Sequence, residues 1–487
     1  MLAMDSTGLY AAFKAKDTRF DGRFFVGISS TGIYCRPVCR ARQPKEENCT
    51  FYPTAAEAER AGYRPCLLCR PELAPGSAIT DATAMLVRRA GRMLEENCGS
   101  GESIEELAGR LGCTDRHLRR IFTAEYNVSP IQYLGTCRLL LAKNLLTDTN
   151  LSVLDVAMAA GFGSLRRFND LFKNHYQLSP TALRKSVSEE KKQSKHITLS
   201  LGYRPPYRFE EILKFLAGRT IPGVEVVKNK EYMRTVRLRN AGKKYITGWV
   251  RVGNAPKKNT LTVTLSEALL PVLPQILAKM RHLFDLYCDP EAVYETLEPM
   301  NDIRPGLCVP GTRLPGSFNV FEMAVRAVLG QQITVKAAST LVGRLVDAFG
   351  APAKTDISGL THVFPLPEDL LTLDGPIENH LGPLGIIATR ARTIYDLAKA
   401  FEQGHIDFDL PTDPEAEIKK LLAIPGIGNW TAQYIAMRTM EWTDAFLGTD
   451  AGITKALEPR SAKELLELAE AWRPWRSYAT INLWNSL

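Results

Sequence analysis

The spacing of hydrophobic residues changes along the chain. Between residues 103 and 180 apolar residues recur at the spacing of amphipathic helices, in two similar units. The later runs 235–239, 245–250 and 260–265 alternate apolar and polar residues and are separated by Gly and Asn, which is typical of an antiparallel sheet with one face in water. From Phe318 onward the helical spacing returns. The pattern predicts a multidomain α+β protein, with mainly helical regions on both sides of a sheet.

The first helical region contains an internal repeat. Phe122-Thr-Ala-Glu-Tyr-Asn-Val-Ser-Pro130 recurs 50 residues later as Phe172-Lys-Asn-His-Tyr-Gln-Leu-Ser-Pro180. Each copy follows a capping-box sequence at 103–106 or 152–155, a helix, and a tight turn at Gly112 or Gly161. We therefore expect an all-α domain with two helix–turn–helix units; a repeated helical bundle without a ligand is the plainer alternative.

Basic residues on the second helix of each unit favour DNA binding over a plain bundle. A recognition helix needs polar and basic side chains in its first turns to reach base edges and phosphates. The candidates are Arg116, Arg119, Arg120, Arg166 and Arg167. With Ala-Met-Ala-Ala-Gly-Phe-Gly-Ser at 157–164, the region resembles the AraC-type DNA-binding domain. The resemblance implies binding to double-stranded promoter DNA, and RNA polymerase as a second partner of an activator.

Length and composition narrow the class of protein. At 487 residues the chain is too long for one hydrophobic core and is expected to form several domains. The net charge of +8 suits a polyanion such as DNA, although many proteins share such an excess. No apolar run approaches the length of a membrane span, and the N-terminus lacks the apolar core of a signal peptide. We therefore expect a cytoplasmic, nucleoid-associated bacterial protein.

Four of the ten cysteines lie in two closely spaced pairs. Cys35 and Cys39 are followed, after 26 residues, by Cys66 and Cys69. Two such pairs can close a tetrahedral zinc site of four thiolates. The spacing alone leaves open whether the zinc site is purely structural or holds a reactive thiolate. No cysteine follows Cys308, so the C-terminal part of the sequence offers no ligand set for an iron–sulfur cluster.

The residues around the cysteine pairs favour the reactive interpretation. Thr-Gly-Ile-Tyr-Cys-Arg-Pro-Val-Cys-Arg-Ala-Arg at 31–42, with Gly-Tyr-Arg-Pro-Cys at 62–66, resembles the N-terminal domain of the Ada family of bacterial adaptive-response proteins. The resemblance implies that Cys35 irreversibly takes a methyl group from a methyl phosphotriester in DNA. Its fellow zinc ligands would be Cys39, Cys66 and Cys69.

Positive charge next to these cysteines suits a phosphate backbone. The arginines expected to contact DNA here are Arg36, Arg40 and Arg42. A zinc ion with four thiolates carries a double negative charge that repels DNA. Methylation of one sulfur would remove one of these charges, so DNA affinity should rise and repair would act as a switch.

The C-terminal half contains the turn Pro425-Gly-Ile-Gly428 between two helical segments. Such a turn exposes backbone N–H groups at a helix N-terminus, where a DNA phosphate can bind; a glycine-rich connection without a ligand is the alternative. Trp430 and Tyr434 follow the turn, and Asp450 lies 20 residues after Trp430. Taken alone, such an Asp is typical of a helix N-cap.

This half of the chain resembles the helix-hairpin-helix DNA glycosylases, and especially the AlkA family of 3-methyladenine DNA glycosylases. Further matching segments lie at 204–207, 283–286, 304–306, 327–331 and 472–478. The resemblance implies excision of alkylated bases such as 3-methyladenine and 7-methylguanine without a cofactor, with Asp450 as the catalytic carboxylate. It also implies a base pocket formed by Trp430, Tyr434, Trp484 and Phe215. The DNA contacts that it implies are Pro425, Gly426, Gly428, Gln331 and Gln332.

Several positions bear on the mechanism. Related bifunctional enzymes carry a Schiff-base lysine where Trp430 stands, so the resemblance implies a monofunctional enzyme that uses water. Three positions depart from the family pattern and bear on substrate range and base flipping: Gly448 replaces a proline, Ala451 a tyrosine, and Gln332 a leucine wedge. The sequence lacks a Pro-Cys-His-Arg motif, so we expect no second, base-directed alkyltransferase domain.

We therefore predict a fusion of a methyl-sensing activator and a glycosylase. The expected segments are a zinc domain at 1–78, a double helix–turn–helix domain at 79–185, a linker at 186–196, a sheet domain at 197–310 and helix-hairpin-helix glycosylase domains at 311–487. The alternative is a methyl-responsive transcription factor whose C-terminal half only binds damaged DNA.

Overall fold

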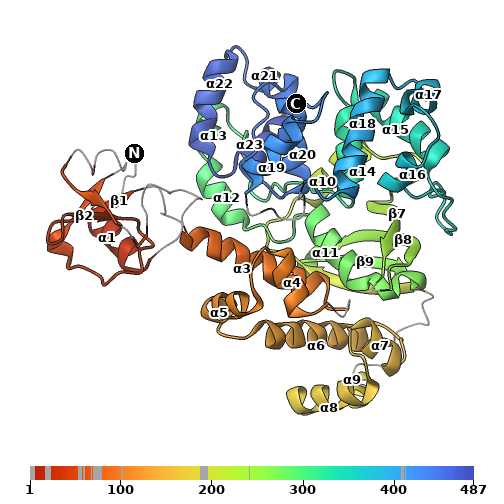
Figure 1. Cartoon of the computed structure of the whole chain (residues 1–487), viewed down its shortest axis with the longest axis horizontal. Helices are drawn as coiled ribbons and strands as arrows, with labels where there is room; N and C mark the ends of the chain where they lie inside the picture. The colour runs from red at the N-terminus through yellow and green to blue at the C-terminus, as the bar shows by residue number, and fades with distance from the viewer. Residues whose placement is uncertain are drawn as a thin grey trace. The chain divides into compact units, whose positions relative to one another are not determined.

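The computed structural model describes residues 6–16, 24–52, 58, 61–66, 68–69, 79–99, 102–186, 196–240, 242–406, 408, 411 and 413–487. Residues 187–195, most of the expected linker, lie outside this part. The chain divides into two compact units, Met1–Arg92 with Ile104–Pro130 and Met93–Ser103 with Ile131–Leu487. Helices predominate and the strands form two separate sheets (Figure 1), which confirms the predicted α+β class. No helix in the described segments is long and apolar enough to cross a membrane.

The N-terminal segment is built on a four-stranded sheet with the order β3-β1-β2-β4. The strands are β1 (Phe25–Ile28), β2 (Ile33–Cys35), β3 (Cys49–Tyr52) and β4 (Arg64–Pro65), accompanied by helix α1 (Ser6–Lys14) and the 3-10 helix η2 (Glu46–Asn48). Strand β2 ends at Cys35, and β4 directly precedes Cys66. Because β2 and β4 pair in parallel, their C-terminal ends meet, and the two cysteine pairs come together.

The first helix–turn–helix unit follows helix α3 (Ile79–Glu96) and consists of α4 (Ile104–Arg110) and α5 (Asp115–Tyr126). Thr114 caps α5, because its hydroxyl oxygen accepts a hydrogen bond from the His117 N–H at 3.2 Å. The helix ends at Asn127, whose left-handed φ of 57° stops further helical turns. Leu107, Leu118 and Phe122 are buried, so the basic face of α5 is left outward.

The second unit repeats this design in α6 (Pro130–Asp148), α7 (Val153–Ala159), α8 (Leu165–Tyr176) and α9 (Pro180–Ser186). The Ser152 hydroxyl caps α7 by accepting the Asp155 N–H at 3.1 Å, as the capping-box sequence predicts. The turn requires glycine at Gly161, since φ is 81° and a Cβ there would lie 2.1 Å from the Cys98 carbonyl oxygen. The predicted pair of helix–turn–helix units is therefore present.

The second sheet is antiparallel throughout, with the order β5-β9-β8-β7-β6. Its strands are β5 (His196–Gly202), β6 (Glu225–Lys228), β7 (Glu231–Arg239), β8 (Tyr245–Ala255) and β9 (Thr260–Ser266). The three runs predicted from alternation lie in β7, β8 and β9. Helix α10 (Phe209–Ala217) is inserted between β5 and β6, and the 3-10 helices η4 (Pro256–Lys258) and η5 (Glu267–Val272) flank β9.

The remainder is helical, as the spacing after Phe318 predicts. Its helices are α11 (Leu273–Leu283), α12 (Pro290–Leu297), α13 (Met300–Ile303), α14 (Val320–Leu329), α15 (Val335–Phe349), α16 (Pro367–Leu371), α17 (Ile377–Leu381), η6 (Gly382–Leu384), α18 (Ala388–Glu402), α19 (Pro414–Leu422), α20 (Asn429–Thr439), α21 (Ala451–Ala456), α22 (Ala462–Ala469), η7 (Glu470–Trp472) and α23 (Arg476–Asn485). Helix α14 packs against α18 and α20, and α21 packs against α23. These contacts place the end of α14 and the beginnings of α20 and α21 around one cavity.

Candidate functional site

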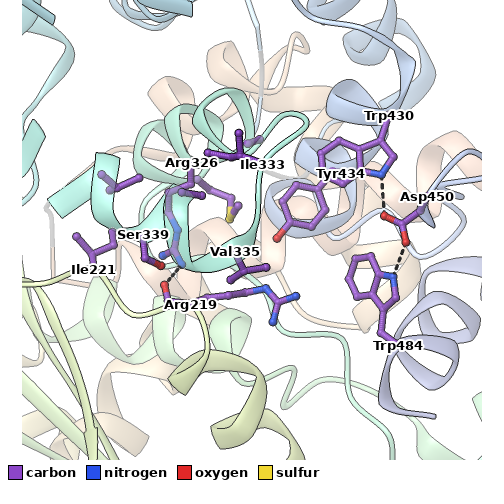
Figure 2. A pocket seen from close by; sticks show the side chains of 15 residues that line it. Arg219, Ile221, Arg326, Ile333, Val335, Ser339, Trp430, Tyr434, Asp450 and Trp484 are labelled. Atoms are coloured by element: carbon purple, nitrogen blue, oxygen red, sulfur yellow. Dashed lines mark hydrogen bonds between the residues drawn. The ribbon is translucent and has the colours of Figure 1, made fainter. Parts of the chain in front are cut away.

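A cavity of about 310 Å³ lies where α14, α20, α21 and α23 meet (Figure 2). Trp430, Tyr434, Trp484 and Asp450 line one side of it. The other side is formed by apolar residues of α14, α15 and the segment after α10, together with two arginines, Arg219 and Arg326. An apolar, aromatic cavity of this size with one carboxylate can enclose a planar ring system.

Asp450 is held in place by four hydrogen bonds. Its Oδ1 accepts from the backbone N–H groups of Gly452 (2.9 Å) and Ile453 (3.1 Å) and from the Trp484 indole Nε1 (2.9 Å). Its Oδ2 accepts one bond, from Trp430 Nε1 at 3.0 Å. Asp450 is therefore both the N-cap of α21 and a pocket carboxylate, and Oδ2 keeps a lone pair.

The aromatic side chains stand close to one another. The rings of Trp430 and Tyr434, one turn apart on α20, are stacked at 5.1 Å with 17° between their planes. The ring centre of Trp484 lies 6.3 Å from that of Tyr434. Phe215, which we expected in the pocket, is stacked parallel to Trp484 at 6.3 Å, but it is not among the side chains that line the cavity. It is buried and supports the Trp484 ring from behind.

Arginines surround the phenol of Tyr434. Burial acts to raise the pKa of this phenol, but the charges of Arg438, Arg219 and Arg326 outweigh burial and lower that pKa below its ordinary value. Arg438 Nη1 donates to the Tyr434 hydroxyl at 2.7 Å. The other two nitrogens of Arg438 donate to the carbonyls of Pro315 and Gly316, so each guanidinium nitrogen makes a hydrogen bond.

The turn between α19 and α20 has the geometry expected of a phosphate-binding hairpin. Gly426 has φ 88°, and a Cβ there would lie 2.1 Å from Thr393 Oγ1. The Thr393 hydroxyl donates to the Pro425 carbonyl at 2.8 Å. No atom lies within 4 Å of a Cβ built on Gly428, so the N-terminus of α20 is open to a ligand.

Gln331 and Gln332 occupy the loop between α14 and α15. The Gln331 amide donates to the Gly426 carbonyl at 2.9 Å and to Thr431 Oγ1 at 3.0 Å, which ties this loop to the hairpin turn. Gln332 is exposed and has a left-handed backbone with φ 54°. The amide of the half-buried Gln331 thus has partners within the protein, whereas Gln332 is exposed; a DNA contact of either residue stays a prediction.

Arg219 and Arg326 were not foreseen from the sequence. Arg326 is partly buried and pairs with two buried carboxylates, Glu225 at 3.2 Å and Glu322 at 3.3 Å. Arg219 follows the end of α10, four residues after Phe215, and this spacing is the only sequence signal that could have associated it with the pocket.

The four expected zinc ligands form one buried cluster. The sulfur atoms of Cys35, Cys39, Cys66 and Cys69 all lie within 4.8 Å of one another. A four-thiolate set at this separation fits the tetrahedral coordination that zinc prefers in proteins. Cys35 and Cys39 also border a small surface pocket with Lys16 and Arg42, whereas the other two cysteines do not.

The arginines near this cluster differ in position. Arg40 and Arg42 are exposed, as DNA contacts must be. Arg36, which we also expected on the DNA face, is completely buried instead. Its Nη1 donates to the Cys69 carbonyl and its backbone N–H to Cys69 Sγ, both at 3.4 Å. Arg36 therefore shapes the cysteine cluster, because a guanidinium enclosed in this way cannot reach a phosphate.

The basic residues of the two second helices are mostly accessible. Arg116, Arg120, Arg166 and Arg167 are exposed. Arg119 is half-buried and forms an ion pair with Asp115, with Nε 2.8 Å from Oδ1. Four of the five expected DNA contacts are thus exposed, and Arg119 is tied to Asp115 through its Nε.

Four family models match the chain in succession. They are the metal binding domain of Ada (residues 8–72), a helix-turn-helix domain (107–186), the AlkA N-terminal domain (198–319) and the HhH-GPD superfamily base excision DNA repair protein (325–471). These matches confirm the resemblances drawn from the motifs. With the cysteine cluster, the first match also confirms zinc as the cofactor of the N-terminal domain. The helix-turn-helix and HhH-GPD matches bear out DNA as a partner.

Relatives match the whole chain as well as its parts. A "Probable bifunctional transcriptional activator/DNA repair enzyme AlkA" of Mycobacterium tuberculosis is 38% identical over 98% of this chain and 96% of its own length. "DNA-3-methyladenine glycosylase 2" of Escherichia coli (strain K12) is 35% identical over 58% of this chain and 96% of its own length. The solved structure of a 3-methyladenine DNA-glycosylase from Archaeoglobus fulgidus covers 59% of this chain and 97% of its own, with TM-score 0.50 and 20% identity; it supports the fold alone.

Proposed function

Because this chain belongs to the family of the bifunctional transcriptional activator/DNA repair enzyme AlkA, we propose that it excises alkylated bases from DNA as a monofunctional glycosylase and also serves as a methyl-sensing activator. The observation that carries the enzymatic part is Asp450. Its carboxylate is oriented by two indole N–H groups at the wall of an aromatic cavity next to an open hairpin turn.

The geometry supports a stepwise excision. The hairpin turn holds a DNA phosphate, and the damaged base enters the cavity against the stacked Trp430 and Tyr434. A base alkylated at N3 or N7 is cationic, so it leaves with the electrons of its glycosidic bond as a neutral molecule. Asp450 Oδ2 stabilises the positive charge that develops on the sugar, and water then bonds to C1′ and loses a proton.

The choice of nucleophile follows from the residues around Asp450. Lysine is absent from the described side chains that line the cavity, and Trp430 occupies the place of the Schiff-base lysine in bifunctional relatives. Water is therefore the nucleophile that we propose, and the DNA backbone is left uncut. Free base released without strand cleavage is the expected product.

The first test compares Asp450→Asn with Asp413→Asn. Asp413 caps α19 as Asp450 caps α21, with its Oδ1 accepting from the Ala416 N–H at 2.9 Å. Asn also caps helices well, so a purely structural Asp450 would tolerate the change as Asp413 does. We expect Asp450→Asn to abolish release of 3-methyladenine and 7-methylguanine while DNA binding persists, and Asp413→Asn to remain active. Equal base release by both variants would show that Asp450 is not the catalytic carboxylate. No release by the unsubstituted protein would favour the rival function, a transcription factor whose C-terminal half only binds damaged DNA.

The N-terminal half supports a second reaction, methyl transfer to Cys35. The sulfur attacks the methyl carbon of a methyl phosphotriester, the S–C bond forms, the C–O bond breaks, and the phosphodiester anion leaves. Zinc held by Cys35, Cys39, Cys66 and Cys69 would keep these thiols ionised at neutral pH. Cys35 and Arg42 line the same small surface pocket. This shared pocket supports access of the DNA backbone to the Cys35 sulfur.

Peptide mapping by mass spectrometry tests this reaction. After incubation with DNA that carries methyl phosphotriesters, the peptide containing Cys35 should gain one methyl group, while the peptide containing Cys49, outside the cluster, stays unchanged. Methylation of another cysteine of the cluster would assign the reaction to that sulfur, and no methylation within the cluster would leave the zinc site with a structural role.

We further propose that methylation turns the protein into an activator. Loss of one thiolate charge lowers the repulsion between the cysteine cluster and DNA, and the two helix–turn–helix units then hold a promoter on the nucleoid where RNA polymerase is recruited. Run-off transcription with purified RNA polymerase should rise several-fold after methylation. An unmethylated protein that activates equally would exclude the switch.

A further inference from the structure

The cavity beside Asp450 contains one guanidinium group whose purpose the mechanism above leaves unexplained. Arg219 lines the cavity and is half-buried. Figure 2 shows its side chain extending from the side of Ile221 towards Trp484, below Val335. A fixed positive charge repels a cationic base. We therefore expect Arg219 to make a favourable contact with the base that offsets this repulsion.

The position of Arg219 is determined at both ends. Its backbone carbonyl accepts a hydrogen bond from Arg326 Nη2, and Arg326 is itself held by the buried Glu225 and Glu322. Its guanidinium carbon lies 3.8 Å above the centre of the Phe215 ring, and Nη1 donates to the Phe215 carbonyl at 3.2 Å. The group is therefore preorganised and loses little freedom when it binds a ligand.

The guanidinium of Arg219 makes fewer hydrogen bonds than those of the two neighbouring arginines. The guanidinium groups of Arg326 and Arg438 are engaged with carboxylates, carbonyls and the Tyr434 hydroxyl. Within the described part of the chain no ion pair includes Arg219, and its guanidinium makes only the bond to Phe215. Since a guanidinium has five N–H groups and no acceptor, it favours a ligand with an acceptor at this place.

We propose that Arg219 is a specificity-determining residue that donates to the exocyclic carbonyl oxygen of the flipped base. The inference rests on the proposed glycosylase function and deepens it. A purine with a carbonyl at C6 offers an acceptor to Arg219, whereas a 6-amino group presents its own N–H groups to the donors. Asp450 does not compete for this contact, because three donors bind its Oδ1 and the lone pair left on Oδ2 acts on the sugar in the proposed mechanism. The cavity thus favours alkylated guanine over adenine alkylated at the same ring nitrogen.

The test uses a single DNA sample treated with a methylating agent. It contains 3-methyladenine with 3-methylguanine, and 7-methyladenine with 7-methylguanine, so each pair shares the alkylated position and differs at C6 and in the 2-amino group that only guanine carries. Competition in one reaction gives the ratio of kcat/KM within each pair after chromatography of the released bases. The variants are Arg219→Met, which keeps the aliphatic packing on Phe215, Arg219→Lys, which keeps a charged donor, and Lys214→Met, which removes a charge from the exposed face of α10.

For Arg219→Met we expect the guanine-to-adenine ratio to fall about tenfold in both pairs, the effect of losing one hydrogen bond from a charged donor. Arg219→Lys should restore part of the ratio, and Lys214→Met should leave it unchanged. Equal loss for all four bases would overturn the inference, because it would mean that Arg219 binds the DNA backbone or only supports the fold. An unchanged ratio would also overturn it. If the unsubstituted protein releases no base at all, the proposed glycosylase function itself fails.

Discussion

At the scale of single residues, Asp450 combines two roles. It caps α21 through two backbone N–H groups, and these bonds direct its carboxylate towards the indoles of Trp430 and Trp484. The cap thus orients the reacting group, so its helix-capping and catalytic interpretations do not exclude each other.

The bond from Trp484 can be tested by Trp484→Phe. The change removes the indole donor to Oδ1 at 2.9 Å but keeps an aromatic ring next to Phe215. We expect kcat for base release to fall about tenfold, the value of one hydrogen bond to a charged group, with little change in DNA affinity. Trp475→Phe, at the start of the same helix and outside the cavity, serves as the control. A kcat equal to that of the control would show that Asp450 does not need this donor.

Asp285 is a second carboxylate with an unusual environment. Burial raises the pKa of its carboxyl to about 7, although the Leu314 N–H and the Tyr478 hydroxyl both donate to Oδ2 at 2.9 Å. In the unfolded chain this group ionises at its ordinary value near 3.8. The folded state therefore holds one proton more between these values, so stability falls as the pH rises from about 4 to about 7 and is level above.

Asp285→Asn removes this titration. Relative to the unsubstituted protein, the free energy of unfolding of the variant should improve with rising pH by up to about 1.4 kcal/mol per pH unit between pH 4 and 7. Urea denaturation at a series of pH values measures this difference. Two parallel stability curves would show that Asp285 keeps an ordinary pKa in the folded protein.

At the scale of elements, the hairpin between α19 and α20 depends on one backbone conformation. Gly426 has φ 88° and packs directly against Thr393 of α18, while Gln331 from the loop after α14 donates to its carbonyl. Three elements thus hold a turn that leaves the N-terminus of α20 open.

Gly426→Ala should disturb this turn. A Cβ would lie 2.1 Å from Thr393 Oγ1 in a backbone conformation that costs an L-residue about 1–2 kcal/mol. We expect at least tenfold weaker DNA binding at constant salt, with a lower melting temperature. Gly382→Ala is the matched control, since its φ of −56° is helical and its Cβ meets no atom within 4 Å. A DNA affinity equal to that of the control would mean that the turn does not contribute to DNA binding.

At the scale of the whole molecule, the two proposed reactions lie in different compact units. The cysteine cluster belongs to the first unit, and Asp450 with its cavity belongs to the second. The residues that line the cavity around Asp450 include no cysteine. The two chemistries therefore have separate requirements.

Removal of zinc should abolish one of the two proposed reactions and leave the other. After treatment with a chelator, methyl transfer to Cys35 should be lost, because zinc is what keeps its thiol ionised, whereas base release should stay within about twofold. Both rates are measured on the same sample, and added zinc should restore the first. A parallel loss of base release would show that the glycosylase half depends on the zinc domain.

Much of this structure could be predicted from short-range patterns in the sequence. The period-two runs predicted β7, β8 and β9, the repeat predicted both helix–turn–helix units, and the cysteine spacing predicted a cluster, because each depends on neighbours within a few residues. Accessibility depends instead on long-range packing. The burial of Arg36 and the place of Phe215 behind Trp484 follow from such contacts. The backbone of Arg219, which lines the cavity, is anchored by Arg326, more than 100 residues later in the chain, and no local pattern contains that contact.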